Sequence, residues 1–86
     1  IKTFLMIIRY FAWIKEITGK EKESLDSNKI NDLDELKLFI ISQYPDLKKH
    51  LDKEILRFAV NQEYILDNIN ITKDDEIAVF PPVSGG

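Results

Sequence analysis

The sequence has no cysteine, one histidine and one methionine among its 86 residues. Without cysteine, the chain can form no disulfide, thiolate nucleophile, cysteine-ligated zinc site or iron–sulfur cluster. A single histidine cannot build a histidine-rich metal centre. No apolar run approaches the ~18 residues that a membrane-spanning helix needs, and no secretory signal is visible. We therefore expect a soluble, cytoplasmic protein that binds no metal and no membrane.

An excess of basic residues is also missing, because twelve basic and fifteen acidic side chains give a net charge of −3. Nucleic acids and anionic membranes are bound by basic faces, so both classes of partner are excluded. The charge is uneven, since residues 1–31 carry +2 and residues 32–86 carry −5. The acidic part is either a solvated surface or a docking surface for a basic partner.

Apolar residues are plentiful at 44% of the chain, with thirteen isoleucines and nine leucines. Together with a charged fraction of 31%, this composition favours a folded chain over intrinsic disorder. The length allows one small domain, and no linker divides it. We expect this domain over residues 6–86, with residues 81–86 as a flexible tail. Residues 1–5 are then a non-native extension or an alternative start upstream of Met6.

The first third of the chain predicts two strands and a helical turn. Leu5–Ala12 is rich in isoleucine and aromatic residues, which is typical of a strand. If Arg9 faces water, the period of two predicts four core residues: Met6, Ile8, Tyr10 and Ala12. Trp13–Thr18 predicts a short helix, ended by Gly19 in a left-handed conformation. Lys20–Ser27 alternates weakly and predicts a second, exposed strand.

Asp32–Tyr44 predicts the main helix. Asp32 suits the N-cap, Glu35 has the capping-box spacing, and Pro45 prevents continuation. The apolar residues of this segment fall on one face: Leu33, Leu36, Phe39, Ile40 and Tyr44. Asp46–Lys53 predicts another short helix.

The last part predicts three strands: Ile55–Val60, Tyr64–Leu66 and Glu76–Phe80. Asn61-Gln62 fits a tight turn between the first two. One main helix can cover only one face of the sheet, which gives a two-layer α+β domain. The element order indicates a β-grasp (ubiquitin-like) fold, with a mixed sheet of four to five strands and one main helix packed on one face.

The second face of such a sheet meets water or a partner. Alternation along the strands predicts that this open face carries Arg9, Phe11, Arg57, Ala59, Ala78 and Phe80, with Tyr64 extending it. These residues are either scattered exposed apolar side chains or a protein-binding patch. Their grouping near the end of the chain favours the patch.

Internal residues offer little chemistry. His50 stands alone, and the serines Ser24, Ser27, Ser42 and Ser84 have no visible base to activate them. The acidic run Asp74–Glu76 is more typical of a solvated turn than of a metal site. No glycine-rich phosphate loop is present.

The end of the chain is more informative: Phe80-Pro81-Pro82-Val83-Ser84-Gly85-Gly86. The two prolines stop the strand, and Pro81 to Gly86 could extend about 20 Å. Glycines lack Cβ and suit a narrow channel on another protein. The reactive group would be the α-carboxylate of Gly86, which needs ATP-dependent adenylation to become an acyl donor. Otherwise the tail is a frayed terminus.

This ending resembles the C-terminal signature of the small subunit of molybdopterin synthase. Three further segments resemble the same family: Tyr10-Phe11-Ala12 with Lys15–Gly19, Ala59–Gln62, and Asp75–Ala78. The similarity covers Met6 to Gly86. The chain departs from the family at Lys73-Asp74-Asp75, where a glycine is frequent, so the geometry of that turn is in question.

The resemblance implies a β-grasp sulfur carrier that binds no cofactor of its own. An E1-like, ATP-using enzyme would adenylate Gly86, with Gly85 beside it, and a persulfide donor would replace AMP to leave a thiocarboxylate. The tail would enter the large synthase subunit and donate sulfur to cyclic pyranopterin monophosphate. The chain would thus be the sulfur-donating subunit of a heterotetramer, not catalytic on its own. The implied partner-binding residues are Phe11, Tyr64, Phe80, Pro81, Pro82, Val83 and Ser84.

Two other hypotheses about the function are also consistent with the sequence. The first is a β-grasp carrier for another pathway, such as thiazole synthesis or tRNA thiolation, or a protein modifier. The second is a non-catalytic ubiquitin-like interaction domain whose Gly-Gly ending is incidental.

Overall fold

The computed structural model describes residues 5–53 and 55–82. Five strands, three α-helices and two 3-10 turns follow one another in these residues. In chain order they are β1 (Leu5–Tyr10), α1 (Trp13–Thr18), β2 (Lys22–Asp26), η1 (Ser27–Lys29), α2 (Leu33–Gln43), η2 (Pro45–Leu47), α3 (Lys48–Asp52), β3 (Arg57–Val60), β4 (Glu63–Ile65) and β5 (Glu76–Phe80).

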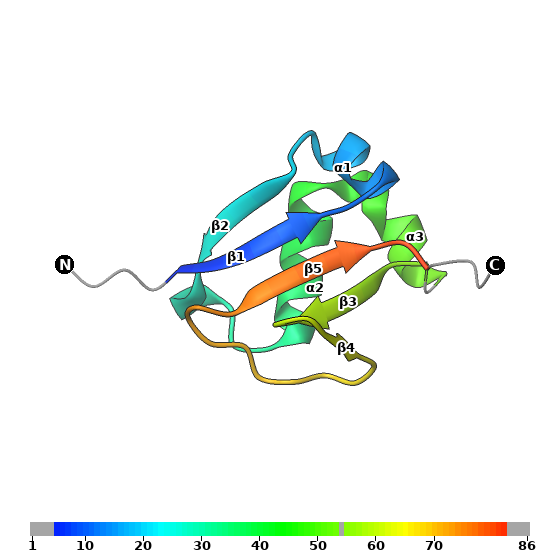
Figure 1. Cartoon of the computed structure of the whole chain (residues 1–86). Coiled ribbons are helices and arrows are strands. Elements are labelled where there is room, and N and C mark those ends of the chain that lie inside the picture. The colour runs from blue at the N-terminus through cyan, green and yellow to red at the C-terminus, as the bar shows by residue number, and fades with distance from the viewer. Residues whose placement is uncertain (1–4, 54, 83–86) are drawn as a thin grey trace.

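The strands form one mixed sheet in the order β2-β1-β5-β3-β4. The first and last strands, β1 and β5, are parallel neighbours, whereas the other pairs are antiparallel. Figure 1 shows α2 lying across one side of this sheet, with α1 and α3 at one end of it. The predicted two-layer α+β architecture with one main helix on one face is confirmed, and the sheet has five strands.

The core lies between the sheet and α2. Met6, Ile8 and Tyr10 of β1 alternate into it, as predicted, and so do Ile77 and Val79 of β5. The helix contributes the buried residues Leu33, Leu36 and Ile40. Every second residue of these strands is buried and packs against the apolar side of the helix. The residues whose periodicity predicted the strands and the helix are therefore the ones that fill the core.

The prediction that Ala12 faces the core is wrong. The strand ends at Tyr10, and Ala12 is exposed with φ of 54°, in the turn that reverses the chain into α1. Ile14 of α1 is fully buried. The period of two cannot be extended past a residue with left-handed backbone, because the strand direction is lost there.

The main helix begins as its sequence predicts. The N–H of Glu35 donates to the Asp32 side chain at 2.8 Å, so Asp32 is the N-cap. Glu35 does not complete a capping box, since its carboxylate accepts from the side chain of Asn31 instead. Helix α2 ends at Gln43, and Pro45 opens the 3-10 turn that follows.

Several strand boundaries differ from prediction by one or two residues. β2 starts at Lys22 and stops at Asp26, because the Asp26 side chain caps the turn of η1. β3 starts at Arg57, while β4 is Glu63–Ile65 and excludes Leu66. The predicted tight turn is confirmed, since Asn61 and Gln62 both have positive φ (52° and 71°).

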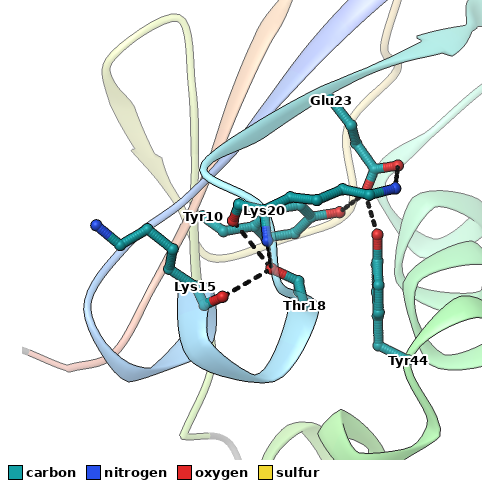
Figure 2. A network of polar contacts seen from close by, with 6 residues as sticks. All are labelled: Tyr10, Lys15, Thr18, Lys20, Glu23 and Tyr44. Carbon is teal, nitrogen blue, oxygen red and sulfur yellow. Dashed lines mark hydrogen bonds and ion pairs between the residues drawn. The ribbon is translucent and has the colours of Figure 1, made fainter.

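A polar cluster closes one side of the core (Figure 2). The hydroxyls of Tyr10 and Tyr44 both donate to the carboxylate of Glu23, the latter at 2.7 Å, and Lys20 lies 3.4 Å from the same carboxylate. The two tyrosine rings meet edge to face, with centroids 5.8 Å apart. Glu23 therefore links β1, β2 and the end of α2.

The cluster shifts the pKa values of its members. Burial, reinforced by the hydrogen bond to Glu23, raises the pKa of Tyr10 well above its ordinary value. For Glu23, burial acts to raise the pKa, but the hydrogen bonds from Tyr10 and Tyr44 and the charge of Lys20 outweigh it. The pKa of Glu23 is therefore lowered. The folded state thus favours an ionised Glu23.

We predict that Glu23→Gln lowers the free energy of unfolding at pH 7 by about 1.5–3 kcal/mol, the range for hydrogen bonds to a charged group. A lowered folded pKa gives stability that is present above the unfolded value of ~4.3 and is lost as the pH falls through the folded value. The difference between wild type and variant should therefore shrink in acid. Urea unfolding at pH 7 and near pH 3 measures it, with the exposed Glu21→Gln as control. An equal loss at both pH values would contradict the role given to the charge.

Candidate functional site

The face of the sheet opposite α2 is the candidate site. Across it, register aligns Arg9 of β1, Ala78 of β5, Ala59 of β3 and Tyr64 of β4 in one row. Phe80 lies opposite Arg57 in the neighbouring row. The predicted open face is therefore present, and β5 runs through its middle.

One half of this face combines an ion pair with two partly exposed apolar side chains. The guanidinium of Arg9 pairs with the carboxylate of Glu76 at 3.0 Å across the parallel strands β1 and β5. Both side chains are about 40% exposed, with values of 39% and 40%, so the pair contributes little stability by itself. Ile7 and Leu5 of β1, 37% and 41% exposed, also emerge on this side. Both residues alternate in phase with Arg9 along β1, so the sequence pattern carries the signal for them.

The other half is aromatic. The rings of Tyr64 and Phe80 meet edge to face, with centroids 6.0 Å apart and an interplanar angle of 87°. Tyr64 is 52% exposed, an unusual position for a large aromatic ring with a ring partner. A pocket of about 460 Å³ is lined by these two rings together with Arg57 and Pro82. We call these four residues the aromatic patch.

Phe11 lies at the same end of the sheet. Its N–H donates to the carbonyl of Val79 at 3.1 Å, which continues the parallel pairing of β1 with β5 beyond Tyr10. Its side chain is 45% exposed. The structure thus brings Phe11 and Phe80 to the same end of adjacent strands, although they are separated by most of the chain.

The tail begins where this patch lies. Pro81 follows β5 directly, has no N–H to donate and so ends the ladder, and Pro82 lines the pocket. The predicted site residues Val83, Ser84, Gly85 and Gly86 lie outside the described residues, so their roles remain predictions. The structure does describe the base of the tail. It lies at the end of a central strand and beside exposed aromatic rings.

The internal candidates have structural roles. The His50 ring packs against the Trp13 ring at an interplanar angle of 53°, with centroids 4.6 Å apart, and the backbone carbonyl of His50 accepts from the N–H of Ile55. Asp75 accepts from the N–H of Thr72 and from the side chain of Asn61. Asp74 adopts a φ of 70° at the turn where the resembling family often has glycine, a conformation that aspartate tolerates.

Within residues 5–53 and 55–82, no group of three or more histidine, cysteine, aspartate or glutamate residues could hold a metal ion. No helix in that part of the chain is both long and apolar enough to span a bilayer.

Solved structures with the same fold support the architecture. The crystal structure of SAMP1 from Haloferax volcanii superposes with a TM-score of 0.77 over 95% of this chain and 99% of that one, at 24% identity. The complex of subunits 1 and 2 of the molybdopterin-converting factor from Helicobacter pylori contains a chain that superposes with a TM-score of 0.69. That chain is 31% identical, over 95% of this chain and 99% of its own length.

Sequence comparisons are more specific. The sequence model of the ThiS family matches residues 8–86. The molybdopterin synthase sulfur carrier subunit of Dictyostelium discoideum is 41% identical over 86 residues, covering 92% of this chain and 93% of the relative. The human protein of the same name is 37% identical over 84 residues, covering 92% and 91%. The chain therefore belongs to the ThiS family and, within it, to the family of molybdopterin synthase sulfur carrier subunits.

Proposed function

We propose that this chain carries sulfur on the terminal carboxyl group of Gly86 and donates it, as the small subunit of molybdopterin synthase, to cyclic pyranopterin monophosphate. The observation that carries the proposal is the continuous similarity to sulfur carrier subunits, with a family match that extends through Gly86. The position of the aromatic patch at the base of the tail supports it, because a carrier has to dock while its tail reaches into another protein.

The chemistry follows from the properties of a carboxylate. A free α-carboxylate, such as the one that Gly86 carries, is a poor electrophile. An E1-like enzyme would use ATP to form the acyl adenylate and release pyrophosphate. A persulfide sulfur would then attack the acyl carbon, AMP would leave, and reduction of the resulting acyl disulfide by a thiol would release the thiocarboxylate. The chain itself binds no cofactor in this scheme, since ATP is consumed on the activating enzyme.

Docking on the large subunit would use the open face. The Helicobacter pylori structure is a complex of subunits 1 and 2 of the molybdopterin-converting factor, and one of its chains is similar to this one. We propose the same kind of contact here, with Phe11, Tyr64 and Phe80 as anchors and residues 81–86 entering the partner. The rings of Tyr64 and Phe80 already contact one another edge to face, so they lose little conformational entropy on binding, which suits them as anchors.

Carriers for thiazole synthesis or tRNA thiolation share the proposed chemistry of the terminal carboxyl group. The name of the ThiS family alone does not separate these pathways. The molybdopterin assignment depends on the curated relatives, which are molybdopterin synthase sulfur carrier subunits.

We predict that one alanine added after Gly86 abolishes molybdopterin formation without unfolding the domain. The added residue moves the terminal carboxyl group beyond the position where it is activated and where it reacts. The measurement is molybdopterin formation in a reconstituted mixture of this chain, the large subunit, the activating enzyme, ATP and a sulfur donor. Thermal unfolding of the extended protein serves as the control for folding. Full activity of the extended protein would refute a mechanism based on the carboxyl group of Gly86.

We predict that Phe80→Ala weakens binding to the large subunit by about 1–3 kcal/mol, the range for an anchoring aromatic residue. Calorimetric titration of the large subunit with wild type and variant measures this difference. Leu38→Ala is the matched control, because Leu38 is an exposed apolar residue (67%) on α2, in the other layer. Equal affinity of Phe80→Ala and wild type would remove Phe80 from the interface.

A further inference from the structure

A second pocket lies at the free edge of the sheet, between the β3–β4 hairpin and the helices α2 and α3. Its lining includes Lys37, Leu51, Leu56, Arg57, Tyr64 and Leu66. We call it the edge pocket. Its volume of about 210 Å³ is below the ~300–1,000 Å³ typical of small-molecule sites. This size suits a side chain of a partner protein better than a cofactor.

The charges of the edge pocket have one sign. Its two charged lining residues, Lys37 and Arg57, are both cations, although the chain as a whole carries −3. Within residues 5–53 and 55–82, neither residue forms an ion pair. The Lys37 ammonium lies 5.2 Å from the centroid of the Phe58 ring, which holds it beside the pocket. The pocket is therefore complementary to a carboxylate.

The acidic neighbours restrict what can bind. Glu63 is the first residue of β4 and Asp67 follows the strand two residues after its end, and neither lines the pocket. A run of acidic residues would be repelled by these two carboxylates, whereas a single carboxylate could reach the two cations. The apolar lining, with Leu66 82% exposed at its rim, favours apolar residues beside that carboxylate.

The backbone of β4 offers a template for an extended segment. Within the described part of the chain, β4 is the edge strand of the sheet and pairs only with β3. Val60 and Glu63 are register partners on either side of the two-residue turn, which is the position of a hydrogen-bonded pair in such hairpins. Bonding alternates along an antiparallel ladder, so Tyr64 directs its N–H and C=O away from β3. An extended peptide could pair with these groups by strand addition.

The edge pocket is continuous with the aromatic patch. Arg57 and Tyr64 line both. A partner that binds Tyr64 and Phe80 therefore lies next to the edge pocket. Further contacts of this partner along the β3–β4 hairpin would be with Lys37 and the rest of that pocket. The edge pocket thus extends the docking surface around the edge of the sheet.

We propose that the edge pocket receives one aspartate or glutamate side chain, flanked by apolar residues, from an extended segment of the molybdopterin synthase large subunit. The inference rests on the proposed function, because it takes the protein docked on the open face to be that subunit. It adds a charge requirement to an otherwise apolar contact. Lys37 and Arg57 then help to select the partner and its orientation.

Calorimetric titration of the large subunit from the same organism tests the proposal, at low and high salt. Arg57→Gln and Lys37→Gln should each raise Kd by about three- to tenfold at low salt, and by less at high salt, where charges are screened. Arg57→Lys should keep most of the affinity. Lys29→Gln, at the opposite edge of the sheet next to β2, is the matched control and should bind like wild type.

The outcomes separate the two proposals. If Arg57→Gln and Lys37→Gln bind like wild type while Phe80→Ala binds weakly, the edge pocket is not used, and the proposed function stands. If wild type does not bind the large subunit, both proposals fall. Self-association of the isolated chain that Arg57→Gln abolishes would assign the pocket to a second copy and overturn the proposal. Thermal unfolding checks each variant, and Lys37→Gln tests the same pocket from a different element if Arg57→Gln does not fold.

Discussion

The parallel pairing of β1 with β5 is the constraint on which the rest of the molecule depends. It joins the first and last strands of the chain at the centre of the sheet, so the core can form only when both ends of the sequence are in place. It also sets the direction of β5, which ends beside Phe11, and thereby places the base of the tail among exposed aromatic rings. Fold and docking surface are thus consequences of one strand pair.

The paired strands β1 and β5 present different residues on the two faces of the sheet. Toward α2, β1 and β5 bury Met6, Ile8, Ile77 and Val79 without polar interruption. Toward the open side, the same two strands present Arg9, Glu76, Ala78 and Phe80, of which Arg9 and Glu76 neutralise one another. Ala59, Ala78 and the Arg9–Glu76 ion pair lie along the middle of this face, and large aromatic residues lie at the end where the tail begins. A surface of this form can bind a partner protein while the tail enters that partner.

Sequence patterns predicted those features that depend on neighbours along the chain. Alternation in Leu5–Tyr10 and Glu76–Phe80 identified the buried and open faces, and Asp32 marked the start of α2. Ala12 was misplaced because the strand stops where the backbone turns left-handed, a feature that hydrophobic alternation does not encode. The Tyr10–Glu23–Tyr44 cluster was missed because its members come from three separate elements. The edge pocket was missed for the same reason, since Lys37 and Arg57 share a lining only once α2 packs beside β3.

The central claim is that Gly86 carries sulfur on its terminal carboxyl group, and intact-protein mass spectrometry tests it most directly. The protein would be incubated with the E1-like enzyme of its host, ATP and a sulfur donor. Exchange of one carboxyl oxygen for sulfur adds about 16 Da, from the difference of the two atomic masses, and the gain should disappear when Gly86 is deleted. An unchanged mass with partners that are active on another carrier would contradict the claim.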